Sequence, residues 1–517
     1  MKKTLLLINA LLFVVSTALL SRTIVVSKTT LPGAYTTINE ATAIAMAGDT
    51  VLVMAGVYNE KVIVQHDGDA NRHLTLQSKY DSLAIIDGTG IAMDEWGNGL
   101  IHIDGLSYID VVGFKVINSS SNGIYAHASD HIRVRKCTTN NTKSSGIGIW
   151  NSSKVLVDSN EVVLACNGGA QECISVAGCD SFEICHNHVH NNGVGLTGGE
   201  GIDSKHGRYG WVHDNHVHDL SRLGIYVDAW NVHMHHVWVY NNHVHNCNAW
   251  GIALADEDGG LLSDVYVYNN IAHNNVMMGI GAEADNWGVA GKTHQLRNIH
   301  IYNNTCYNNG GTWGAGVHVS GGLCDSIFVR NNIVASNKYA QLLVENDLTN
   351  MFLENNLLSG TNSLGTTSNN QITANPMFVN GSKFDFHLLA SSPAIGKATL
   401  SDCPDFDFDY NKRSTADGKN PDVGAFEYQS GNSLTLPTEV ENFYFYPNPS
   451  SSFITVLAQE DEARVELVNL YGQIVCRFAS KPFPQIIDIS PFPQGLYVIR
   501  IVKDKTLLKS AKLIKSQ

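Results

Sequence analysis

A short sequence unit recurs along the middle of the chain and constrains the fold more than any other feature. Its variants are FEICHNHVHNN, GWVHDNHVHDL, VWVYNNHVHNC, VYVYNNIAHNN, IHIYNNTCYNN, IFVRNNIVASN and MFLENNLLSG. Aligning them superimposes one asparagine column, made of Asn187, Asn215, Asn242, Asn270, Asn304, Asn332 and Asn356. Gly113, Cys137 and Asn160 extend this column upstream in steps of 24, 23 and 27 residues. The repetition predicts a solenoid of at least ten turns.

Each repeat contains short alternating runs of β-branched and aromatic residues, broken by glycine and asparagine. This pattern predicts an all-β fold in which parallel strands coil once per repeat. Equivalent residues then stack at the strand spacing of roughly 4.8 Å. A buried asparagine can therefore hydrogen-bond to the asparagine of the next turn, and we expect the asparagines from Asn187 to Asn304 to form one continuous buried stack.

The tandem VYNN…GI units, the asparagine column and the early segment AGDTVLVMAGVYNEKV resemble right-handed parallel β-helix proteins of the pectate-lyase superfamily. The resemblance covers residues 22–360 and implies a right-handed parallel β-helix there. Polysaccharide lyases and hydrolases are common in that superfamily, but the fold alone does not decide the chemistry.

A second column follows each asparagine and sets the orientation of one sheet. If Ile174, Ile202 and Ile225 point inward, the residues two positions further on do so as well. The residues between them are then predicted to face solvent and to form one patch, which includes Glu172, Glu200, Asp203, Lys205 and Asp228. Carboxylates this close require a cation, a proton or a substrate group between them. The alternative is a solvated ion-pair network around Lys205.

Within this patch, the spacing Glu200-x4-Lys205 resembles a segment of chondroitinase B and related alginate lyases. That resemblance implies that Glu200 binds a metal ion and that Lys205 is the Brønsted base. Those enzymes carry an arginine about one turn later, where this chain has Asp228. Arg208 or Arg222 would have to take the place of that arginine.

These residue types suit β-elimination of a uronic-acid polymer, in which the C5 proton becomes removable once the adjacent carboxylate is neutralised. A calcium ion is the expected cofactor, with Glu172, Glu200, Asp203 and Asp228 as its candidate ligands. A neighbouring cation and partial burial would lower the pKa of Lys205. The candidates for returning a proton to the leaving oxygen are Tyr226, His206 and His127. Trp150, Trp230 and Trp250 would either stack on sugar rings or pack within the solenoid.

We therefore predict a polysaccharide lyase acting on an anionic polysaccharide, and two alternatives remain open. One is a glycoside hydrolase that uses Asp203 and Asp228 as its carboxylate pair. The other is a non-catalytic adhesin or glycan-binding protein of the cell surface.

Histidines form two further columns on the sheet that follows the asparagine turn. His188, His216 and His243 make one column, and His190, His218, His245 and His273 make the next. Such columns could bind a transition metal. The register places them on a different sheet from Lys205, and we interpret them as a structural ladder.

The two ends of the chain have separate roles. Lys2, Lys3 and the apolar run after them predict a signal peptide over residues 1–21. Residues 361–428 are expected to cap the open end of the solenoid, and residues 429–441 form a linker. Residues 442–517, with the YPNP motif at Tyr446, a YGQ turn and GLYVIRI, resemble the C-terminal sorting domain of type IX secretion substrates. The resemblance implies a small β-sandwich that is recognised by the type IX secretion machinery and delivers the protein to the outer surface.

Composition narrows the possible partners. There are 34 basic and 48 acidic side chains, giving a net charge of −14, which argues against nucleic acid as a partner. After the signal peptide, no segment is apolar enough to predict a transmembrane helix. The ten cysteines would permit disulfides in an oxidising compartment, but their spacing predicts no pairing, and a structural role in the core is favoured.

Overall fold

The computed structural model describes residues 21–515, except residues 95, 194–197, 285–291, 322, 346–348, 361–369, 414–419, 430–442, 447–452, 459–462, 470–473, 479–480, 482–484, 494 and 504–505. The predicted signal peptide and linker lie outside the described residues, apart from Ser21 and Gln429. The chain divides into two units, Met1–Tyr428 and Gln429–Gln517.

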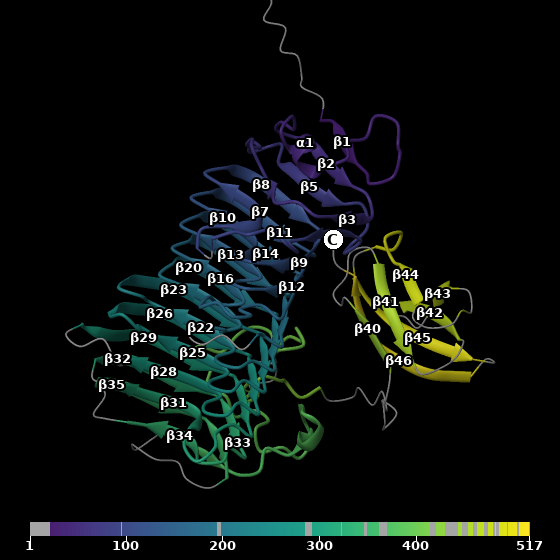
Figure 1. Ribbon diagram of the computed structural model, residues 1–517. Helices are drawn as coiled ribbons and strands as arrows, with labels where there is room; N and C mark the ends of the chain where they lie inside the picture. The colour runs from purple at the N-terminus through teal and green to yellow at the C-terminus, as the bar shows by residue number, and fades with distance from the viewer. Residues whose placement is uncertain are drawn as a thin grey trace, which may run out of the picture. The chain divides into compact units, whose positions relative to one another are not determined.

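In the first unit, the described residues form three parallel sheets, which Figure 1 shows as stacked rungs. Sheet A contains β1 (Thr23–Val26), β2 (Thr50–Val53), β5 (Leu74–Ser78), β8 (Ser107–Val112), β11 (Asp130–Arg135), β14 (Ser153–Asp158), β17 (Asp180–Cys185), β20 (Arg208–His213), β23 (Val232–Tyr240), β26 (Gly260–Tyr268), β29 (His294–Tyr302), β32 (Cys324–Arg330) and β35 (Thr349–Glu354). Sheet B contains β3 (Gly56–Tyr58), β6 (Ala84–Asp87), β9 (Lys115–Ser119), β12 (Thr138–Thr142), β15 (Glu161–Val163), β18 (His188–His190), β21 (His216–His218), β24 (His243–His245), β27 (Ile271–His273), β30 (Thr305–Tyr307), β33 (Ile333–Ala335), β36 (Leu357–Ser359) and β37 (Ile372–Thr373). Sheet C contains β4 (Val62–Ile63), β7 (Gly99–Asp104), β10 (Asn122–His127), β13 (Ile147–Trp150), β16 (Ile174–Ala177), β19 (Ile202–Lys205), β22 (Ile225–Asp228), β25 (Ile252–Ala255), β28 (Ile280–Ala284), β31 (Ala315–Gly321) and β34 (Ala340–Val344).

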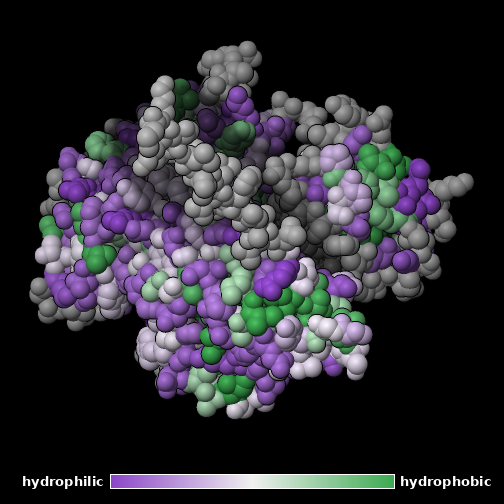
Figure 2. Space-filling model, turned by 90° about the horizontal axis from the view of Figure 1, so that it is seen from above, coloured by the Kyte–Doolittle hydropathy of each residue, from purple (hydrophilic) through white to green (hydrophobic). Residues whose placement is uncertain are grey.

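From β4 to β36 the strands follow one another along the chain in the order C, A, B, so each of these turns adds one strand to each sheet. The predicted β-helix is therefore confirmed. Its core consists of stacked β-branched residues: Ile174, Ile202 and Ile225 are paired in register and fully buried. Burying each such side chain contributes roughly 1.5–3 kcal/mol. On the face shown in Figure 2, hydrophilic residues predominate and hydrophobic residues form smaller groups among them.

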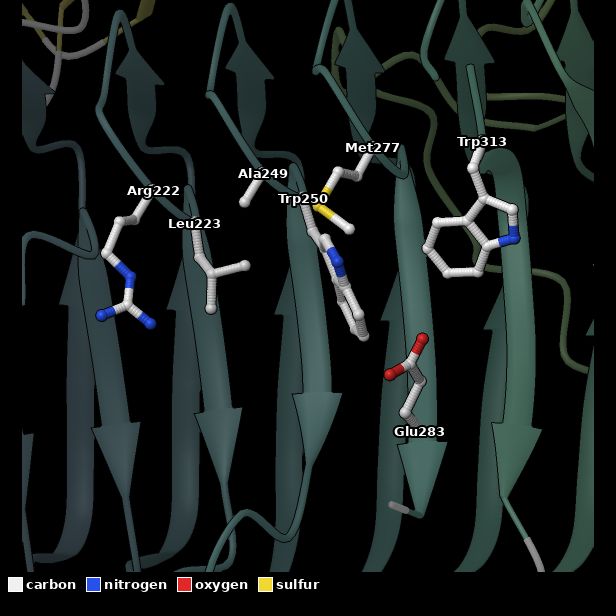
Figure 3. A pocket seen from close by; sticks show the side chains of 7 residues that line it. All are labelled: Arg222, Leu223, Ala249, Trp250, Met277, Glu283 and Trp313. Atoms are coloured by element: carbon white, nitrogen blue, oxygen red, sulfur yellow. The ribbon is translucent and has the colours of Figure 1, made fainter. Parts of the chain in front are cut away.

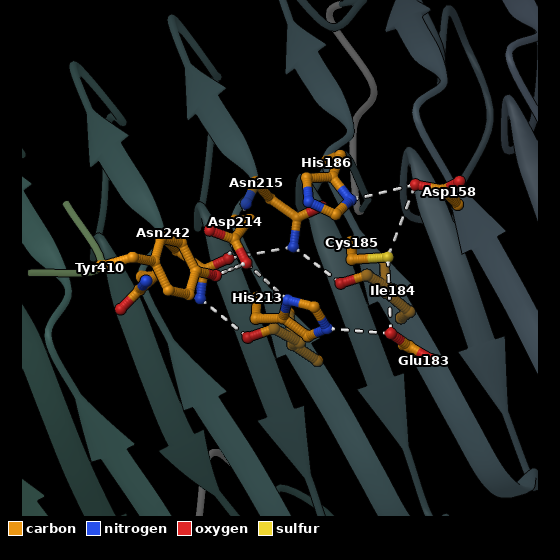
Figure 4. Close-up of polar contacts among 12 residues, drawn as sticks. Asp158, Glu183, Ile184, Cys185, His186, His213, Asp214, Asn215, Asn242 and Tyr410 are labelled. Carbon is orange, nitrogen blue, oxygen red and sulfur yellow. Dashed lines mark hydrogen bonds and ion pairs between the residues drawn. The ribbon is translucent and has the colours of Figure 1, made fainter. Parts of the chain in front are cut away.

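The predicted asparagine stack is also confirmed, and it follows the corner between sheets A and B. The backbone N–H and the side-chain amide of Asn242 both donate to Oδ1 of Asn270, each at 3.0 Å. The same pair of bonds links every step of the series Asn160, Asn187, Asn215, Asn242, Asn270, Asn304, Asn332 and Asn356. Each amide also donates to a backbone carbonyl, as Asn215 does to Ile184 in Figure 4.

The residue before each ladder asparagine turns the chain at this corner. Asp214, Asn241 and Asn269 have left-handed backbone conformations, with φ between 53° and 54°. Asparagine and aspartate tolerate this conformation better than most residues, which explains the recurring NN and DN pairs. A second ladder, which the sequence reasoning missed, runs from Asn275 through Asn309 and Asn337 to Gln341 at the corner between sheets B and C.

The N-terminal end of the β-helix is covered by α1 (Ile38–Thr42), whose Ile38 and Ala41 are buried in the core. A capping box begins this helix: Thr37 Oγ1 accepts from the backbone N–H of Glu40, and the Glu40 carboxylate accepts from the backbone N–H of Thr37. The two bonds satisfy N–H groups that the helix itself cannot pair.

Thr37→Ala is expected to destabilise this end of the β-helix by about 1 kcal/mol, because the Glu40 N–H loses its acceptor. Amide hydrogen exchange over residues 38–42 measures the effect locally. Thr30→Ala, at an exposed position outside the helix, is the matched control. Equal exchange rates in the two variants would contradict the role of the cap.

The segment after β37 packs along the side of the last turns. It contains β38 (Phe378–Asn380), η1 (Gly381–Lys383) and β39 (Asp385–Leu388). Its backbone carbonyls accept hydrogen bonds from five corner asparagines of the β-helix: Asn241, Asn269, Asn303, Asn331 and Asn355. The buried Arg413 donates to Oδ1 of Asn269 at 2.8 Å and forms an ion pair with Glu427 at 3.5 Å. The segment thus covers polar groups at the outer edge of this corner.

The second unit has the two antiparallel sheets expected of a small β-sandwich. One sheet contains β40 (Phe443–Tyr446), β41 (Phe453–Ala458) and β44 (Gln485–Asp488). The other contains β42 (Arg464–Asn469), β43 (Ile474–Arg477), β45 (Gly495–Lys503) and β46 (Thr506–Lys515). Ile454, Leu467 and Ile499 belong to its own hydrophobic core. None of the helices formed by the described residues has the length and apolar character needed to span a membrane.

Candidate functional site

Three adjacent strands of sheet C, β16, β19 and β22, bring the predicted charged residues together. The register pairs Ala177 with Lys205 and Lys205 with Asp228, so the last two lie side by side on neighbouring turns. Asp203 lies between Ser175 and Tyr226 in the same way. Glu172 and Glu200 immediately precede the first two strands. We call Glu172, Glu200, Asp203, Lys205 and Asp228 the acidic cluster.

The acidic cluster is more buried than its sequence pattern indicates. Glu172, Glu200, Asp203 and Asp228 are buried, as is Tyr226, so the prediction that these outward residues face solvent is wrong. The reason is a second apolar layer outside sheet C, in which Leu223, Tyr226 and Trp250 pack together. Alternation along a strand fixes the side of the sheet, but it does not show whether other side chains cover that side.

Lys205 is at the centre of the acidic cluster. Its Nζ donates to Oε1 of Glu172 at 3.4 Å and lies 3.4 Å from Oδ2 of Asp203 and 3.7 Å from Oδ2 of Asp228. The Nζ atom also lies 4.6 Å from the ring centre of Trp230, within the range of a cation–π contact. The ammonium group therefore joins carboxylates from three consecutive turns.

The negative charge of the acidic cluster exceeds the nearby positive charge. Arg222 Nε lies 3.1 Å from Oε1 of Glu200 and adds a second cation. Four ionised carboxylates carry −4, and two cations carry +2, which leaves −2. Among the described residues, neither oxygen of Asp203 accepts a hydrogen bond, and neither does Oδ2 of Asp228. Buried carboxylates with so little compensation favour a proton or an additional cation.

Burial and this imbalance of charge together set the pKa values of the acidic cluster. Burial raises the pKa of Glu200 to about 7 and that of Asp228 to about 7, and it raises the pKa of Asp203 well above its ordinary value. Burial alone would lower the pKa of Lys205, but the negative charges of Asp203, Glu172 and Asp228 raise it above the ordinary lysine value. Lys205 is thus held as an ammonium ion while its carboxylate neighbours lack another cation.

The other predicted catalytic residues are placed differently. His206 follows β19 directly. Burial and the positive charge of Lys205 lower its pKa, so the imidazole is neutral. Its buried Nδ1 has no hydrogen-bond partner among the described residues. The Tyr226 hydroxyl is 3.4 Å from Oε2 of Glu257, and its pKa is raised well above the ordinary value by burial and by Asp228. Arg208 lies on sheet A, where it forms an exposed ion pair with Asp180 at 2.6 Å. Of the two proposed arginines, Arg222 is the one that contacts the acidic cluster.

The aromatic candidates are spread along sheet C and its connections. Trp230 is 37% exposed and stands beside Lys205. Trp150 donates from its indole N–H to Ser175 Oγ at 3.1 Å. His127 is three strands away from Lys205, roughly 14 Å at the strand spacing, and contacts Asp104. Trp250 is buried in the outer apolar layer and packs there.

A pocket of about 210 Å³ adjoins the acidic cluster. Its lining residues are Arg222, Leu223, Ala249, Trp250, Met277, Glu283 and Trp313. Figure 3 shows Arg222 at one side of this pocket and Trp313 at the other, with apolar side chains between them. Arg222 lines the pocket and also contacts Glu200, so it connects the pocket with the acidic cluster. The sequence reasoning missed this pocket. The backbone N–H of Glu257, in the acidic loop after β25, donates to Asp228 Oδ1 at 3.1 Å.

The histidine columns occupy sheet B, as predicted, and are therefore separate from Lys205. All ten cysteines are free, and eight of them are buried. This agrees with a structural role for most of the thiols.

Two family models match the chain. Residues 98–286 and 172–378 match a right-handed β-helix region, and residues 444–516 match a secretion system C-terminal sorting domain. The uncharacterized protein YwoF of Bacillus subtilis (strain 168) is 26% identical over 192 residues, which cover 33% of this chain. The chain spans only 41% of the length of that curated relative.

Solved structures with a similar course of the chain include two polysaccharide lyases. Pectate lyase Pel9A has a TM-score of 0.48 at 16% identity, covering 79% of this chain and 97% of that chain. The PL6 family alginate lyase AlyGC has a TM-score of 0.41 at 15% identity, covering 74% of this chain and 60% of that chain. The two β-helix matches together span residues 98–378, more than half of the 517 residues. The chain therefore belongs to the right-handed β-helix family and carries a secretion system C-terminal sorting domain near its C-terminus.

Proposed function

We propose that this protein is a secreted polysaccharide lyase that cleaves uronic-acid-containing glycans by β-elimination, with Lys205 as the base. One observation carries the proposal: Lys205 lies between the buried carboxylates and solvent. Its side chain is 19% exposed, whereas those of Glu172, Glu200, Asp203 and Asp228 are 11%, 8%, 1% and 0% exposed. Among the residues of the acidic cluster, Lys205 is the one best placed to reach a substrate atom.

The residues present fit a hard divalent cation. Carboxylate oxygens are the ligands that calcium prefers, and the oxygens of Asp203 and Asp228 that accept no hydrogen bond, together with Glu172, would supply them. With all four carboxylates ionised, the excess charge of −2 equals the charge that such an ion would balance. When bound, calcium would neutralise the uronate carboxylate of the substrate and lower the pKa of Lys205.

The elimination can be written with the residues of this chain. Lys205 first releases its ammonium proton to solvent. The neutral Nζ then takes the C5 proton, the electron pair of the C5–H bond forms the C4–C5 double bond, and the bond from C4 to the glycosidic oxygen breaks. The leaving oxygen takes up a proton from solvent; His206 adjoins Lys205 and is less buried than Tyr226, but its neutral imidazole would have to be protonated before it could donate. The products are a shortened chain and an unsaturated uronate.

The adjoining pocket supports a sugar as the ligand. Its Trp313 and Met277 side chains offer an apolar surface to a ring face, and the Arg222 guanidinium at its edge can pair with a carboxylate. The exposed Trp230 offers a second stacking surface beside Lys205. An anionic polysaccharide would satisfy both the apolar and the charged parts of this surface. The sorting domain supports delivery to the cell surface or exterior by type IX secretion.

A hydrolase remains the second candidate, because a pKa of about 7 for Asp228 is suitable for a general acid. The full burial of Asp203 and Asp228 argues against it, since a nucleophile or general base has to approach the substrate. Cleavage by paired carboxylates would require the acidic cluster to open.

The experiment that tests the proposal is a screen of the purified protein against pectate, alginate, glycosaminoglycans and ulvan. We expect one polymer to be shortened with the ultraviolet absorbance of an unsaturated uronate, and we expect a chelator to suppress the reaction and calcium to restore it. New reducing ends without this absorbance would replace the lyase with the hydrolase. Binding without shortening would identify an adhesin.

A further inference from the structure

The outer face of sheet B carries seven stacked imidazoles that the proposed lyase reaction does not use. They form the two columns His188, His216, His243 and His190, His218, His245, His273, in register on consecutive strands. Successive rings lie 4.7–5.2 Å apart, close to the spacing of the strands. We call these seven residues the histidine ladder.

The ring nitrogens converge in pairs between the two columns. Nε2 of His188 lies 2.8 Å from Nε2 of His218, and the same atoms of His216 and His245 are 3.0 Å apart. His243 and His273 repeat the arrangement at 2.9 Å. Two neutral imidazoles share one proton in such a contact, so one nitrogen of each pair keeps a lone pair. Stacking alone would not require nitrogen to face nitrogen at each step.

Two sets of three nitrogens are close enough to bind one ion. The nitrogens of His188, His216 and His218 lie within 4.8 Å of one another, and so do those of His216, His243 and His245. Tetrahedral zinc with bonds of about 2.0–2.1 Å separates its ligand nitrogens by about 3.3–3.4 Å. The paired nitrogens would move apart by a few tenths of an ångström, and the third nitrogen of each set, which lies within 4.8 Å of the other two, would move closer to them.

The ladder also keeps its imidazoles in the form that binds metals. Burial and the neighbouring imidazoles lower the pKa of His188 to about 4 and that of His216 to about 3, and burial lowers the pKa of His245 to about 4. These rings are therefore neutral near pH 7, and a neutral ring offers a lone pair. His190 differs, because the Glu161 carboxylate, 3.5 Å from its Nε2, raises its pKa.

We propose that the histidine ladder binds a divalent late transition-metal ion, such as Zn²⁺, Cu²⁺ or Ni²⁺, through three imidazoles. Imidazole is a preferred ligand of these ions, whereas the carboxylates around Lys205 suit calcium. Both sets of three contain His216, so one ion can take three imidazoles at a time. The ladder site lies on sheet B and does not depend on the proposed lyase activity at sheet C.

A competing donor group occurs where sheet A ends and is less suitable. Figure 4 shows Cys185 between Asp158 and Glu183, with His186 beside Asp158 and His213 beside Glu183. His213 is bonded to Asp214 and Glu183, and these contacts raise its pKa to about 9 despite its burial. A protonated imidazole has no lone pair to give. Burial also raises the pKa of the Cys185 thiol, which disfavours the thiolate.

The test is a zinc titration of the full chain, prepared without a polyhistidine tag, followed by calorimetry and by metal analysis after dialysis. We expect one tightly held equivalent in the parent protein. His216→Gln should weaken this binding by at least about 100-fold, more than the loss of an outer-shell partner costs. His188→Gln should retain one equivalent, because His216, His243 and His245 remain.

Controls separate the ladder from other zinc sites and from unfolding. His66→Gln, outside the ladder, and His213→Gln, in the competing group, should leave the stoichiometry unchanged. Should His216→Gln unfold, the double variant His188→Gln/His245→Gln removes one imidazole from each set while retaining His216, and it should lose binding. Any of three results would overturn the proposal. The parent protein fails to bind zinc tightly, or binding is unchanged in both His216→Gln and the double variant, or His213→Gln loses binding.

Discussion

Replacing Lys205 with alanine is expected to lower turnover on the cognate polysaccharide by about 10²- to 10⁴-fold, the contribution typical of a positioned base. Nζ of Lys205 would be the atom that takes the C5 proton, and among the described residues the acidic cluster holds no second amine. The rate of formation of the unsaturated product measures the effect. Glycan binding should be largely retained, since Trp230 and the adjoining pocket remain.

The burial of Lys205 makes alanine an incomplete control. Removing the ammonium leaves buried carboxylates without their nearest cation, and breaking a buried pair costs about 3–5 kcal/mol. Lys205→Arg keeps the positive charge but cannot serve as a base, because arginine stays protonated. We therefore expect Lys205→Arg to fold, as judged by thermal unfolding, and to be as inactive as the alanine variant. Activity near the parent level in both variants would exclude Lys205 as the base.

Asp203→Asn and Asp228→Asn distinguish the remaining possibilities. In the lyase they should raise the calcium concentration needed for residual activity, since each removes a candidate ligand. If these variants are inactive while the Lys205 variants turn over normally, the hydrolase takes the place of the lyase. If no substitution changes turnover, the acidic cluster is a structural ion-pair network.

Asn270→Ala is expected to lower the free energy of unfolding of the β-helix by about 3–5 kcal/mol. The substitution removes the acceptor of two Asn242 donors and the amide that donates to Val239 O and to Asn304 Oδ1. All of these groups are buried, and each buried group left without a partner costs about 1–3 kcal/mol. Chemical denaturation followed by circular dichroism measures the change.

The exposed Asn71 provides the control for this substitution. Asn71→Ala should change stability by less than about 0.5 kcal/mol, as is usual for surface positions. A similarly small effect of Asn270→Ala would mean that water or backbone movement replaces the lost ladder bonds. The interpretation of the column as a stabilising stack would then be wrong.

The asparagine ladder that includes Asn270 could be predicted because it depends on one residue type repeated at one position of successive turns. Asn187, Asn215 and Asn242 align in the sequence without any knowledge of the loops. The second ladder escaped notice because its residue type changes at both ends. Cys247 donates to its first asparagine, Asn275, and Gln341 accepts from its last, Asn337. A repeat pattern identifies a stack only where the stacked residue stays the same.

The strand register of the candidate site could be predicted from the sequence, but the burial of its side chains could not. The sequence pattern paired Lys205 with Asp228 correctly, because strand alternation and repeat alignment fix both positions. It gave no sign that Trp250 and Leu223 would form an outer layer over the same face. The contact between Arg222 and Glu200 joins two connecting segments rather than two strands, so no periodicity reports it.

The asparagine ladder tolerates turns of different length, and this affects how the fold can diversify. Successive ladder partners are separated by 24 to 34 residues, yet the N–H to Oδ1 distance stays between 2.9 and 3.1 Å. The extra residues of the longest turn are therefore accommodated away from this corner. Insertions between sheets C and A could remodel the surface beside Lys205 while the corner bonds keep their geometry. A lineage with this scaffold could acquire new substrate ranges by exchanging loops, without first having to evolve a new core.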